Sequence, residues 1–455
     1  MRELICSGAE ARVGSMQRTT LASIALAVSC ALASPLGAQE TALVVENVML
    51  VDGTGKGPFG PVSILVEGNR IRNIATGRIE APAAERIAGA GKWVIPGLID
   101  VHVHLRGRDG GEKAALGVLH GFLYSGVTSI YDAGNNPDFI LSLRGKERSG
   151  EIVAPRIFAT GAIVTAPDGH GAGMAVTVED FARDRAKLDA HIARKPDILK
   201  ITQDEHGWGT RPMIDSMSAD LLERVIRYYH ENGIRTTIHI SNEVHAWEAI
   251  YAGIDTLAHP VIQGPVSDKY LNMMRVKRVP QASTLTVGEG YSRLAEHPEF
   301  LDQPLYRATL DPREIARLKT EESKKQAENR WAWWMKVMTP VAQENLRKLD
   351  EVGGIVALGT DQSLGPAVHR ELELLVGGGI TPLEAIKIGT LNAAIFLGRE
   401  KDMGSIEAGK LADIVLLDAD PTKDINNVKR IHTVIKDGKV VDRSRLAIPV
   451  NVPTP

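Results

Sequence analysis

The stretch VIPGLIDVHVHLRG, residues 94–107, joins an apolar run to two histidines. The apolar run predicts a buried strand, and His102 and His104 stand at its carboxyl end. Side chains two positions apart on a strand point to the same face. We therefore expect the two imidazoles to serve one site together, at the edge of the protein's core.

Further strand-like runs follow along the chain, separated by stretches with helical periodicity. They occur at 127–134, 156–165, 198–202, 235–240, 255–260, 280–287 and 354–361. Helix-period segments such as 220–233 and 243–253 close on glycine, a common signal for a helix C-terminus. This α/β alternation predicts a (β/α)8 TIM barrel, and an open doubly wound sheet is the alternative.

Both ends of the chain carry short β patterns broken by glycine and proline. These patterns lie at 42–55 and 61–76 near the start, and at 412–420 and 431–442 near the end. The two ends are expected to pair into one small β-sandwich beside the barrel. The predicted domains are a leader at 1–38, the barrel at 93–403 and the two parts of the sandwich at 39–92 and 404–455.

The leader has the layout of a secretory signal peptide. From Met16, a possible true start, one arginine precedes a short apolar run and then small residues. Cleavage is expected after Ala38, with Ala33 as the second choice. The alternatives are an uncleaved anchor helix and a lipoprotein cleavage before Cys30. The predicted location is periplasmic or secreted, with no stable membrane insertion after cleavage.

The cysteine content follows from this leader. Cys6 and Cys30 both lie inside it, so the mature protein would contain no disulfide, thiol nucleophile or thiolate ligand. Any metal must then be held by nitrogen or oxygen ligands. The formal net charge of −3 gives no basic patch that would indicate a nucleic-acid partner.

Titratable side chains stand where the predicted barrel strands end, which is where barrel enzymes carry their chemistry. They are His102, His104, Lys200, His239, His259 and Asp361. Taken singly, each histidine has a structural explanation as a hydrogen-bonded wall residue, and the aspartate has one as a helix cap. Their recurrence at successive strand ends is what predicts a shared site.

Lys200 stands between two apolar neighbours in ILKIT, 198–202, where an unpaired ammonium is unfavourable. One explanation is an ion pair with Asp361. The other is reaction with carbon dioxide, which gives an anionic carbamate able to bridge two cations. The carbamate is expected only if imidazoles and a carboxylate converge on the same space.

The combination of HVH, the lysine, the two single histidines and GTD (359–361) resembles the amidohydrolase superfamily. The segment 379–421, which contains GITPLEAIKIGT and GKLADIVLLDADP, also resembles that superfamily. The similarity is strongest to the imidazolonepropionase-like branch, which includes metal-dependent dipeptidases and carboxypeptidases. It covers nearly all of the expected mature chain.

The resemblance implies a binuclear metal site. His102, His104 and Asp361 would hold one divalent ion, His239 and His259 a second, and carboxylated Lys200 would bridge them. Nitrogen and oxygen ligands suit Zn²⁺, with cobalt or manganese as laboratory substitutes. Such a site would activate a bridging water, and Asp361 would be the catalytic residue that takes its proton and returns it to the leaving amine.

The residues that bind substrate are less evident from the sequence. His170, in APDGHGAGM (166–174), matches a histidine loop of the related peptidases, and a surface turn is the alternative. His369 and Arg370 also match a family stretch; Arg370 could bind a carboxylate or form a salt bridge on a helix surface. The family's small glycine-rich loop is replaced here by the charged TQDEHGWG, 202–209.

The sequence therefore predicts an exported metal-dependent amidohydrolase, related to peptidases and carboxypeptidases, that cleaves a C–N bond. The expected substrate is a dipeptide or N-acyl amino acid. The alternatives are a cyclic amide or imide, a lactone or a phosphotriester at the same site, or an inactive periplasmic binding barrel. Homo-oligomer formation is left open. The long connection from Val287 to Gly354 contains WAWW (331–334), which is expected to pack on a helix rather than grip substrate.

Overall fold

The structure is a computed structural model that describes residues 42–105 and 111–451. The expected signal peptide, with both cysteines, lies outside these residues. Within the described ranges, no helix combines the length and the apolar character needed to cross a lipid bilayer.

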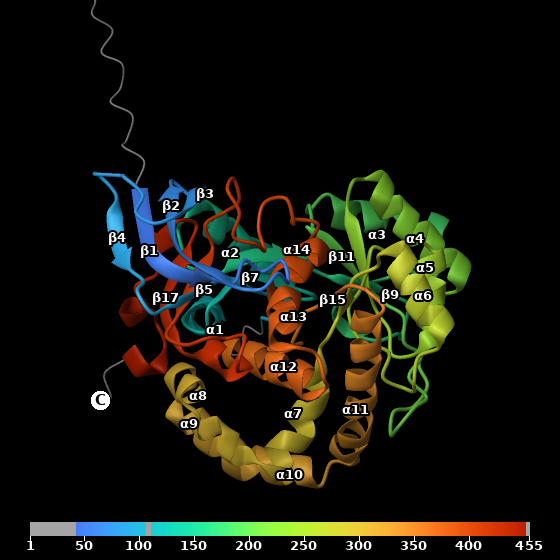
Figure 1. The fold of residues 1–455 in the computed structure, drawn as a ribbon. Helices are drawn as coiled ribbons and strands as arrows, with labels where there is room; N and C mark the ends of the chain where they lie inside the picture. The colour runs from blue at the N-terminus through green and yellow to red at the C-terminus, as the bar shows by residue number, and fades with distance from the viewer. Residues whose placement is uncertain (1–41, 106–110, 452–455) are drawn as a thin grey trace, which may run out of the picture. The chain divides into compact units, whose positions relative to one another are not determined.

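Strands from both ends of the chain form one eight-stranded sheet, the predicted small β-domain (Figure 1). Its order is β18-β17-β16-β5-β1-β2-β3, with β4 also paired to β1. The strands are β1 (Ala42–Leu50), β2 (Phe59–Glu67), β3 (Arg70–Thr76), β4 (Glu85–Ala88), β5 (Trp93–Pro96), β16 (Ile414–Leu417), β17 (Ile431–Lys436) and β18 (Lys439–Val440). Antiparallel pairing of β16 with β5 joins the two ends, and Val45, Ile64 and Ile414 share one buried cluster.

The first strand-like run of the sequence is two strands in two different sheets, and the prediction of one continuous barrel strand was wrong. β5 belongs to the small sheet, whereas β6 (Leu98–Val103) belongs to the barrel. Gly97 separates them, and its N–H donates to the carbonyl of Asp413 at 2.9 Å. A Cβ at Gly97 would lie 2.2 Å from Thr128 Oγ1, so only glycine fits where the chain passes between the sheets.

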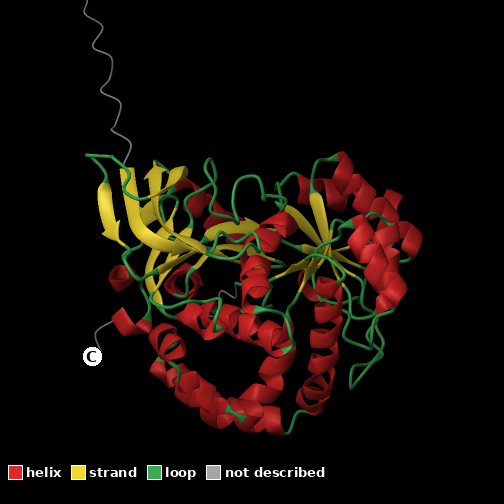
Figure 2. Ribbon diagram, viewed as in Figure 1, coloured by secondary structure: helices red, strands yellow, loops and turns green. Residues whose placement is uncertain are grey.

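Parallel strands form the TIM barrel, as predicted (Figure 2). One set is β6, β7 (Val127–Asp132) and β8 (Arg156–Ala159); the other is β10 (Ala175–Thr177), β9 (Ile163–Thr165), β11 (Ile198–Thr202), β12 (Arg235–His239), β13 (Thr256–Leu257), β14 (Gln281–Ala282) and β15 (Val356–Ala357). The predicted third strand is divided, since β8 pairs with β7 and β9 pairs with β11. Backbone hydrogen bonds from Val101 N to Leu358 O (2.9 Å) and from Asp361 N to His102 O (2.7 Å) connect the last strand to the first.

The seventh predicted strand, 280–287, is only partly a strand, and its last three residues begin a helix. Only Gln281–Ala282 is extended, and α7 (Leu285–Glu296) begins three residues later. The buried carboxylate of Glu371 accepts hydrogen bonds from Leu285 N and Thr286 N, each at 2.8 Å. An anion that binds the free N–H groups of a first turn stabilises the helix there. Because Glu371 is distant in sequence, the local apolar pattern gave the wrong prediction for 285–287.

Helices follow the barrel strands and bury one face on them. They are α1 (Gly111–Tyr124), α2 (Pro137–Ser149), α3 (Phe181–Ile192), α4 (Ala219–Glu231), α5 (Glu243–Tyr251), α6 (Asp268–Lys277), α12 (Gly365–Gly377), α13 (Pro382–Lys387) and α14 (Ala393–Leu397). In α4, Ser218 caps the first turn by accepting from Leu221 N, and Leu222, Val225 and Tyr229 are buried at helical spacing.

The long connection after β14 is helical. After α7 it contains α8 (Pro304–Thr309), α9 (Pro312–Arg317), α10 (Ser323–Ala327) and α11 (Arg330–Glu351), coloured yellow to orange in Figure 1. Trp331 is the second residue of α11. Its ring lies 4.9 Å from that of Trp208, and the Arg211 guanidinium lies 4.0 Å from its centre. These contacts show that Trp331 packs against the loop that follows β11 rather than against a helix, whereas Trp333 is 63% exposed.

Gly97→Ala should lower the free energy of unfolding by about 2 kcal/mol or more, because the added methyl meets Thr128 and a packed site relaxes poorly. Gly145→Ala is the matched control, since Gly145 is inside α2 with open space around it. That control should leave stability unchanged or raise it by up to about 1 kcal/mol. Urea unfolding of both variants measures the difference, and equal midpoints would contradict the steric account.

Candidate metal centre

The structure brings the six side chains predicted to bind metal to one end of the barrel. His102 is on β6 and His104 directly follows that strand. Lys200 is on β11 and His239 on β12, while His259 and Asp361 follow β13 and β15. The His259 ring lies 4.5 Å from the ring of His102 and 4.3 Å from that of His239. The strand-end positions therefore converge as the barrel prediction requires.

His102, His104 and Asp361 form one group whose ligand atoms face each other. The Nε2 atoms of the two histidines are 3.3 Å apart, and Asp361 Oδ1 lies 3.7 Å from His102 Nε2 and 3.3 Å from His104 Nε2. Ligands of a tetrahedral zinc ion at about 2.0–2.1 Å are separated by about 3.4 Å. These three atoms can hold a divalent ion with little movement.

Backbone carbonyls fix the orientation of the first two imidazoles. His102 Nδ1 donates to Ala258 O at 2.9 Å, and His104 Nδ1 donates to Gly134 O at 2.8 Å. A carbonyl oxygen only accepts, so in each neutral ring Nδ1 carries the hydrogen and Nε2 keeps its lone pair. His259 is oriented in the same way by a 2.9 Å hydrogen bond between its Nδ1 and Thr284 Oγ1. This is the usual arrangement around metal-binding histidines.

The buried carboxylate of Asp100 holds the backbone of this ligand group in place. Asp100 accepts from His102 N at 3.1 Å, from Thr360 N at 3.0 Å and from Thr360 Oγ1 at 2.6 Å. It therefore ties the strand that carries the paired histidines to the residue before Asp361. Burial raises the pKa of Asp100 to about 8, although these hydrogen bonds oppose the shift. Asp361 itself has a left-handed backbone, with φ of 54°.

Lys200 lies among these ligands rather than facing the outer helices. Its Nζ is 3.2 Å from His102 Nε2, and the side chain is buried. Within the described ranges, no carboxylate lies within 4.0 Å of Nζ, so the predicted alternative of a direct ion pair with Asp361 is not formed. Burial lowers the pKa of Lys200 to about 7, which favours the neutral amine near neutral pH.

The charges of the centre suit a cation. Burial lowers the pKa values of His102, His239 and His259, so these rings stay neutral and available as ligands. Burial alone would raise the pKa of Asp361, but the neighbouring His102 and His104 hold it well below its usual range. Burial opposes the protonation of His104, but the contact with Asp361 raises the pKa of that ring, so a metal ion bound there would displace a proton. An ionised carboxylate and imidazole nitrogens are donors that suit a divalent metal ion.

A second group lies at the same end of the barrel and contains residues that the sequence analysis did not assign. His170, Asp204 and His239 offer ligand atoms within 4.8 Å of one another. Asp204 Oδ2 is 3.2 Å from His239 Nε2, and His170 Nδ1 is 2.8 Å from His206 Nε2. Asp204 and His206 belong to the charged loop after β11. Because both residues closely follow the strand that carries Lys200, their place in the sequence could have identified them as candidate ligands.

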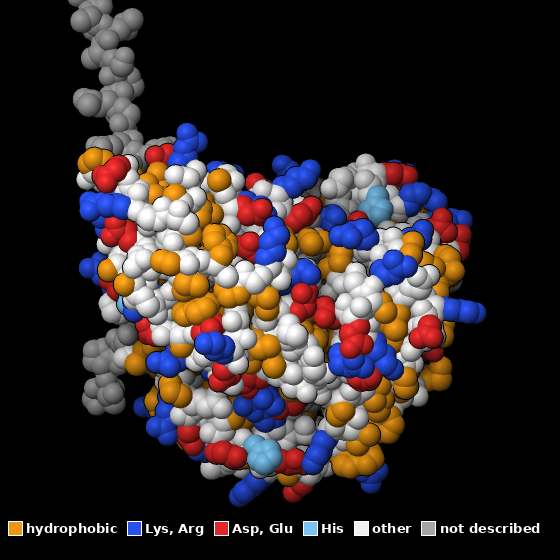
Figure 3. All heavy atoms as spheres, viewed as in Figure 1, with side chains coloured by type: hydrophobic (Ala, Val, Ile, Leu, Met, Phe, Trp, Pro, Cys, Tyr) orange, Lys and Arg blue, Asp and Glu red, His pale blue; other side chains and the backbone are white. Residues whose placement is uncertain are grey.

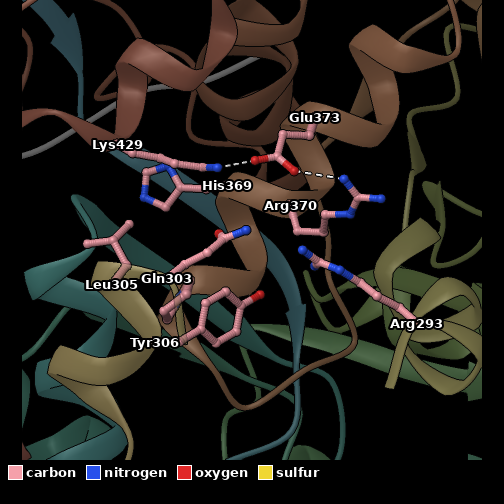
Figure 4. A pocket seen from close by; sticks show the side chains of 9 residues that line it. Arg293, Gln303, Leu305, Tyr306, His369, Arg370, Glu373 and Lys429 are labelled. Carbon is pink, nitrogen blue, oxygen red and sulfur yellow. Dashed lines mark hydrogen bonds and ion pairs between the residues drawn. The ribbon is translucent and has the colours of Figure 1, made fainter. Parts of the chain in front are cut away.

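His369 and Arg370, the other two predicted substrate residues, are engaged elsewhere on α12 (Figure 4). His369 is buried and its Nε2 donates to Ser125 O at 2.9 Å, and Arg370 pairs with Glu289 at 2.8 Å and with Glu373 at 2.7 Å. Neither side chain is hydrogen-bonded or ion-paired to the metal cluster in the described chain. The geometry favours the salt-bridge interpretation of Arg370, because its guanidinium already holds two carboxylates.

On the face shown in Figure 3, acidic and basic side chains are interspersed. This agrees with the small net charge of −3. An active centre at the end of a barrel, reached by small molecules, fits such a surface better than an extended binding face does.

A TIM barrel that gathers these ligands at the carboxyl ends of its strands defines a metal-dependent hydrolase. The model of the amidohydrolase family matches residues 93–441, and the chain belongs to that family. The family acts on small-molecule substrates and generally uses divalent metals, and the two ligand groups described above fit this chemistry.

Individual relatives cover the chain to different extents. An imidazolonepropionase of Shouchella clausii is 41% identical over 105 residues, which are 21% of this chain and only 24% of that protein. An ochratoxinase of Aspergillus niger is 24% identical over 404 residues, 76% of this chain and 75% of its own length. A crystal structure of a Xaa-Pro dipeptidase with bound methionine has a TM-score of 0.70 and 24% identity, and covers 88% of this chain and all 100% of its own.

Thr284→Ala should weaken zinc binding about 10- to 100-fold, because removal of the hydroxyl frees the His259 ring to rotate. Thr284→Ser is the control, since it keeps the hydroxyl at the same position and should bind zinc within about threefold of the wild type. Isothermal titration of metal-free protein with zinc measures both affinities. Equal affinities in the two variants would show that the hydroxyl does not orient His259.

Proposed function

We propose that the protein is an exported binuclear amidohydrolase that cleaves the amide bond of a dipeptide or an N-acyl amino acid. The observation that carries the proposal is the convergence of all six predicted ligand side chains at one end of the barrel. Export rests on the signal-peptide pattern of residues 1–38, which predicts a periplasmic or secreted enzyme.

The substrate class is supported by the names of similar proteins. These include the Xaa-Pro dipeptidase and a prolidase complexed with N-methylphosphonate-L-proline, whose structure has a TM-score of 0.70 and 21% identity. The ochratoxinase and the imidazolonepropionase are further relatives. Peptidase-like members recur among these relatives, and therefore an amide substrate with a free carboxylate is the first to test.

The two metals are assigned by position. His102, His104 and Asp361 would hold the first ion, and His239 and His259 would hold the second, with Lys200 as a bridging carbamate. Nitrogen and oxygen donors suit Zn²⁺. A bound divalent ion lowers the pKa of water and polarises a carbonyl oxygen.

The chain's own residues supply orientation and proton transfer. Asp361 is held ionised by the neighbouring histidines, so it can take a proton from the attacking water. It then returns that proton to the leaving amine, as the breakdown of a tetrahedral adduct requires. His170 stands beside His239, with ring centroids 4.3 Å apart, and is placed to contact substrate or metal.

Purified protein should hydrolyse at least one member of a panel of dipeptides and N-acyl amino acids, measured by release of free amine. Chelation should abolish this activity and zinc should restore it, because the ligand set supplies no alternative nucleophile. Cyclic imides, lactones and phosphotriesters belong in the same panel as competing substrate classes. Chelator-resistant hydrolysis, or tight binding of peptides that stay intact, would overturn the proposal.

Asp361→Asn should lower kcat at least about 100-fold, since the amide cannot take the proton, and general acid–base groups contribute typically 10²–10⁴-fold. Metal content should fall only partly, because the amide oxygen still faces His104 and both histidines remain. Kinetics and elemental analysis of the same preparation separate the two effects. Near wild-type kcat in this variant would rule out the proton-transfer role.

A further inference from the structure

We propose that Asp204 is a metal ligand, and that His170, Asp204 and His239 form a site for a divalent cation. The inference rests on the metal-dependent function proposed above and gives the second cation a carboxylate ligand from the loop after β11. The charged loop that replaces the family's small glycine-rich segment thereby acquires a role.

Asp204 has a buried carboxylate. One of its oxygens accepts two hydrogen bonds, and the other faces His239. Oδ1 accepts from His206 N at 2.9 Å and from Ser241 Oγ at 3.0 Å. Oδ2 lies 3.2 Å from His239 Nε2, and the residue is 2% exposed. The backbone and the serine therefore fix the carboxylate plane, and Oδ2 is presented to the space beside His239.

The contact between Asp204 Oδ2 and His239 Nε2 can be made through a proton on Nε2 or through a cation bound to both atoms. Without metal, a proton on Nε2 serves, and His239 donates to the carboxylate. When His239 binds metal through Nε2, that proton leaves, and two lone pairs at 3.2 Å would repel each other. A cation bound to both atoms removes the repulsion, since ligand atoms of one zinc ion lie about 3.4 Å apart.

His170 completes the group from another loop. Its ring stacks on that of His239, with centroids 4.3 Å apart and planes inclined by 23°. Its Nδ1 is 2.8 Å from His206 Nε2, so the histidine of the loop after β11 holds the His170 ring in place. Trp208 of the same loop is packed against Trp331 of α11, which holds this loop near the barrel end.

The site has a consequence for charge. His239 and His259 are neutral donors, so a dication held by them alone would need an anionic ligand from the Lys200 carbamate. Asp204 can supply a carboxylate ligand instead, from a buried position fixed by His206 N and Ser241 Oγ. Occupancy of the second position should therefore survive loss of the lysine.

The test measures metal content and affinity in Asp204→Asn, Lys200→Ala and the control Glu205→Gln. Glu205 is adjacent in sequence, and its carboxylate is 46% exposed and lies 4.0 Å from His245. Metal-free proteins are titrated with zinc by calorimetry, then equilibrated with zinc at fixed free concentration and analysed for bound metal. Cobalt-loaded samples give the visible absorption bands as a second readout.

Asp204→Asn should keep one equivalent of metal and bind the second at least about tenfold more weakly, with a changed cobalt spectrum. Glu205→Gln should match the wild type, and Lys200→Ala should keep the second equivalent. The asparagine oxygen can still accept from His206 N and Ser241 Oγ, so the fold should persist. If thermal unfolding shows that it does not, His170→Asn provides the same test from the other loop.

Two full equivalents with unchanged affinity in folded Asp204→Asn or His170→Asn would overturn the inference. Wild-type protein that binds no metal would remove both this site and the proposed function. Wild-type hydrolysis with metal affinity independent of Asp204 would remove the site alone. Asp204-dependent metal binding in a protein that hydrolyses nothing in the panel would leave the site standing and remove the proposed function.

Discussion

The metal centre depends on the hydrogen bonds that join the last barrel strand to the first. Asp361 N donates to His102 O at 2.7 Å, and Asp100 binds both His102 N and Thr360. Together these bonds bring residues more than 250 positions apart into register, since His102 and Asp361 share one backbone contact. If the register between these two strands shifted by one residue, the side chains of the first ligand group would point to the opposite face.

Much of the fold and of the first ligand group could be predicted because each signal is local. The HVH pair and His239 stand at strand ends, Lys200 lies two residues before the end of β11, and a barrel places all strand ends together. The two wrongly predicted strands are altered by contacts with residues that are distant in sequence. Gly97 divides a run that looks continuous because it passes close to Thr128, and Glu371 starts α7 inside a run that looks extended. Neither partner can be inferred from the pattern of the run itself.

Asp204 and His206 show a second limit of prediction from sequence. Loop residues have no periodicity, so the sequence gives their identity but not the direction of their side chains. Their placement depends on Ser241, on His170 and on the contact of Trp208 with Trp331, which come from three other segments. The long helical connection is thus part of the support of the centre, although it contributes none of the ligand side chains described above.

The pairing of β16 with β5 has a consequence for the order in which the molecule can assemble. Val94 lies opposite Leu416, so the edge of β5 that faces away from β1 stays unpaired until more than 300 further residues have been synthesised. Contacts between such widely separated residues slow folding and expose unpaired strand edges in the meantime. β16 therefore pairs late, and a nascent chain that lacks it would expose an unpaired strand edge able to bind other chains.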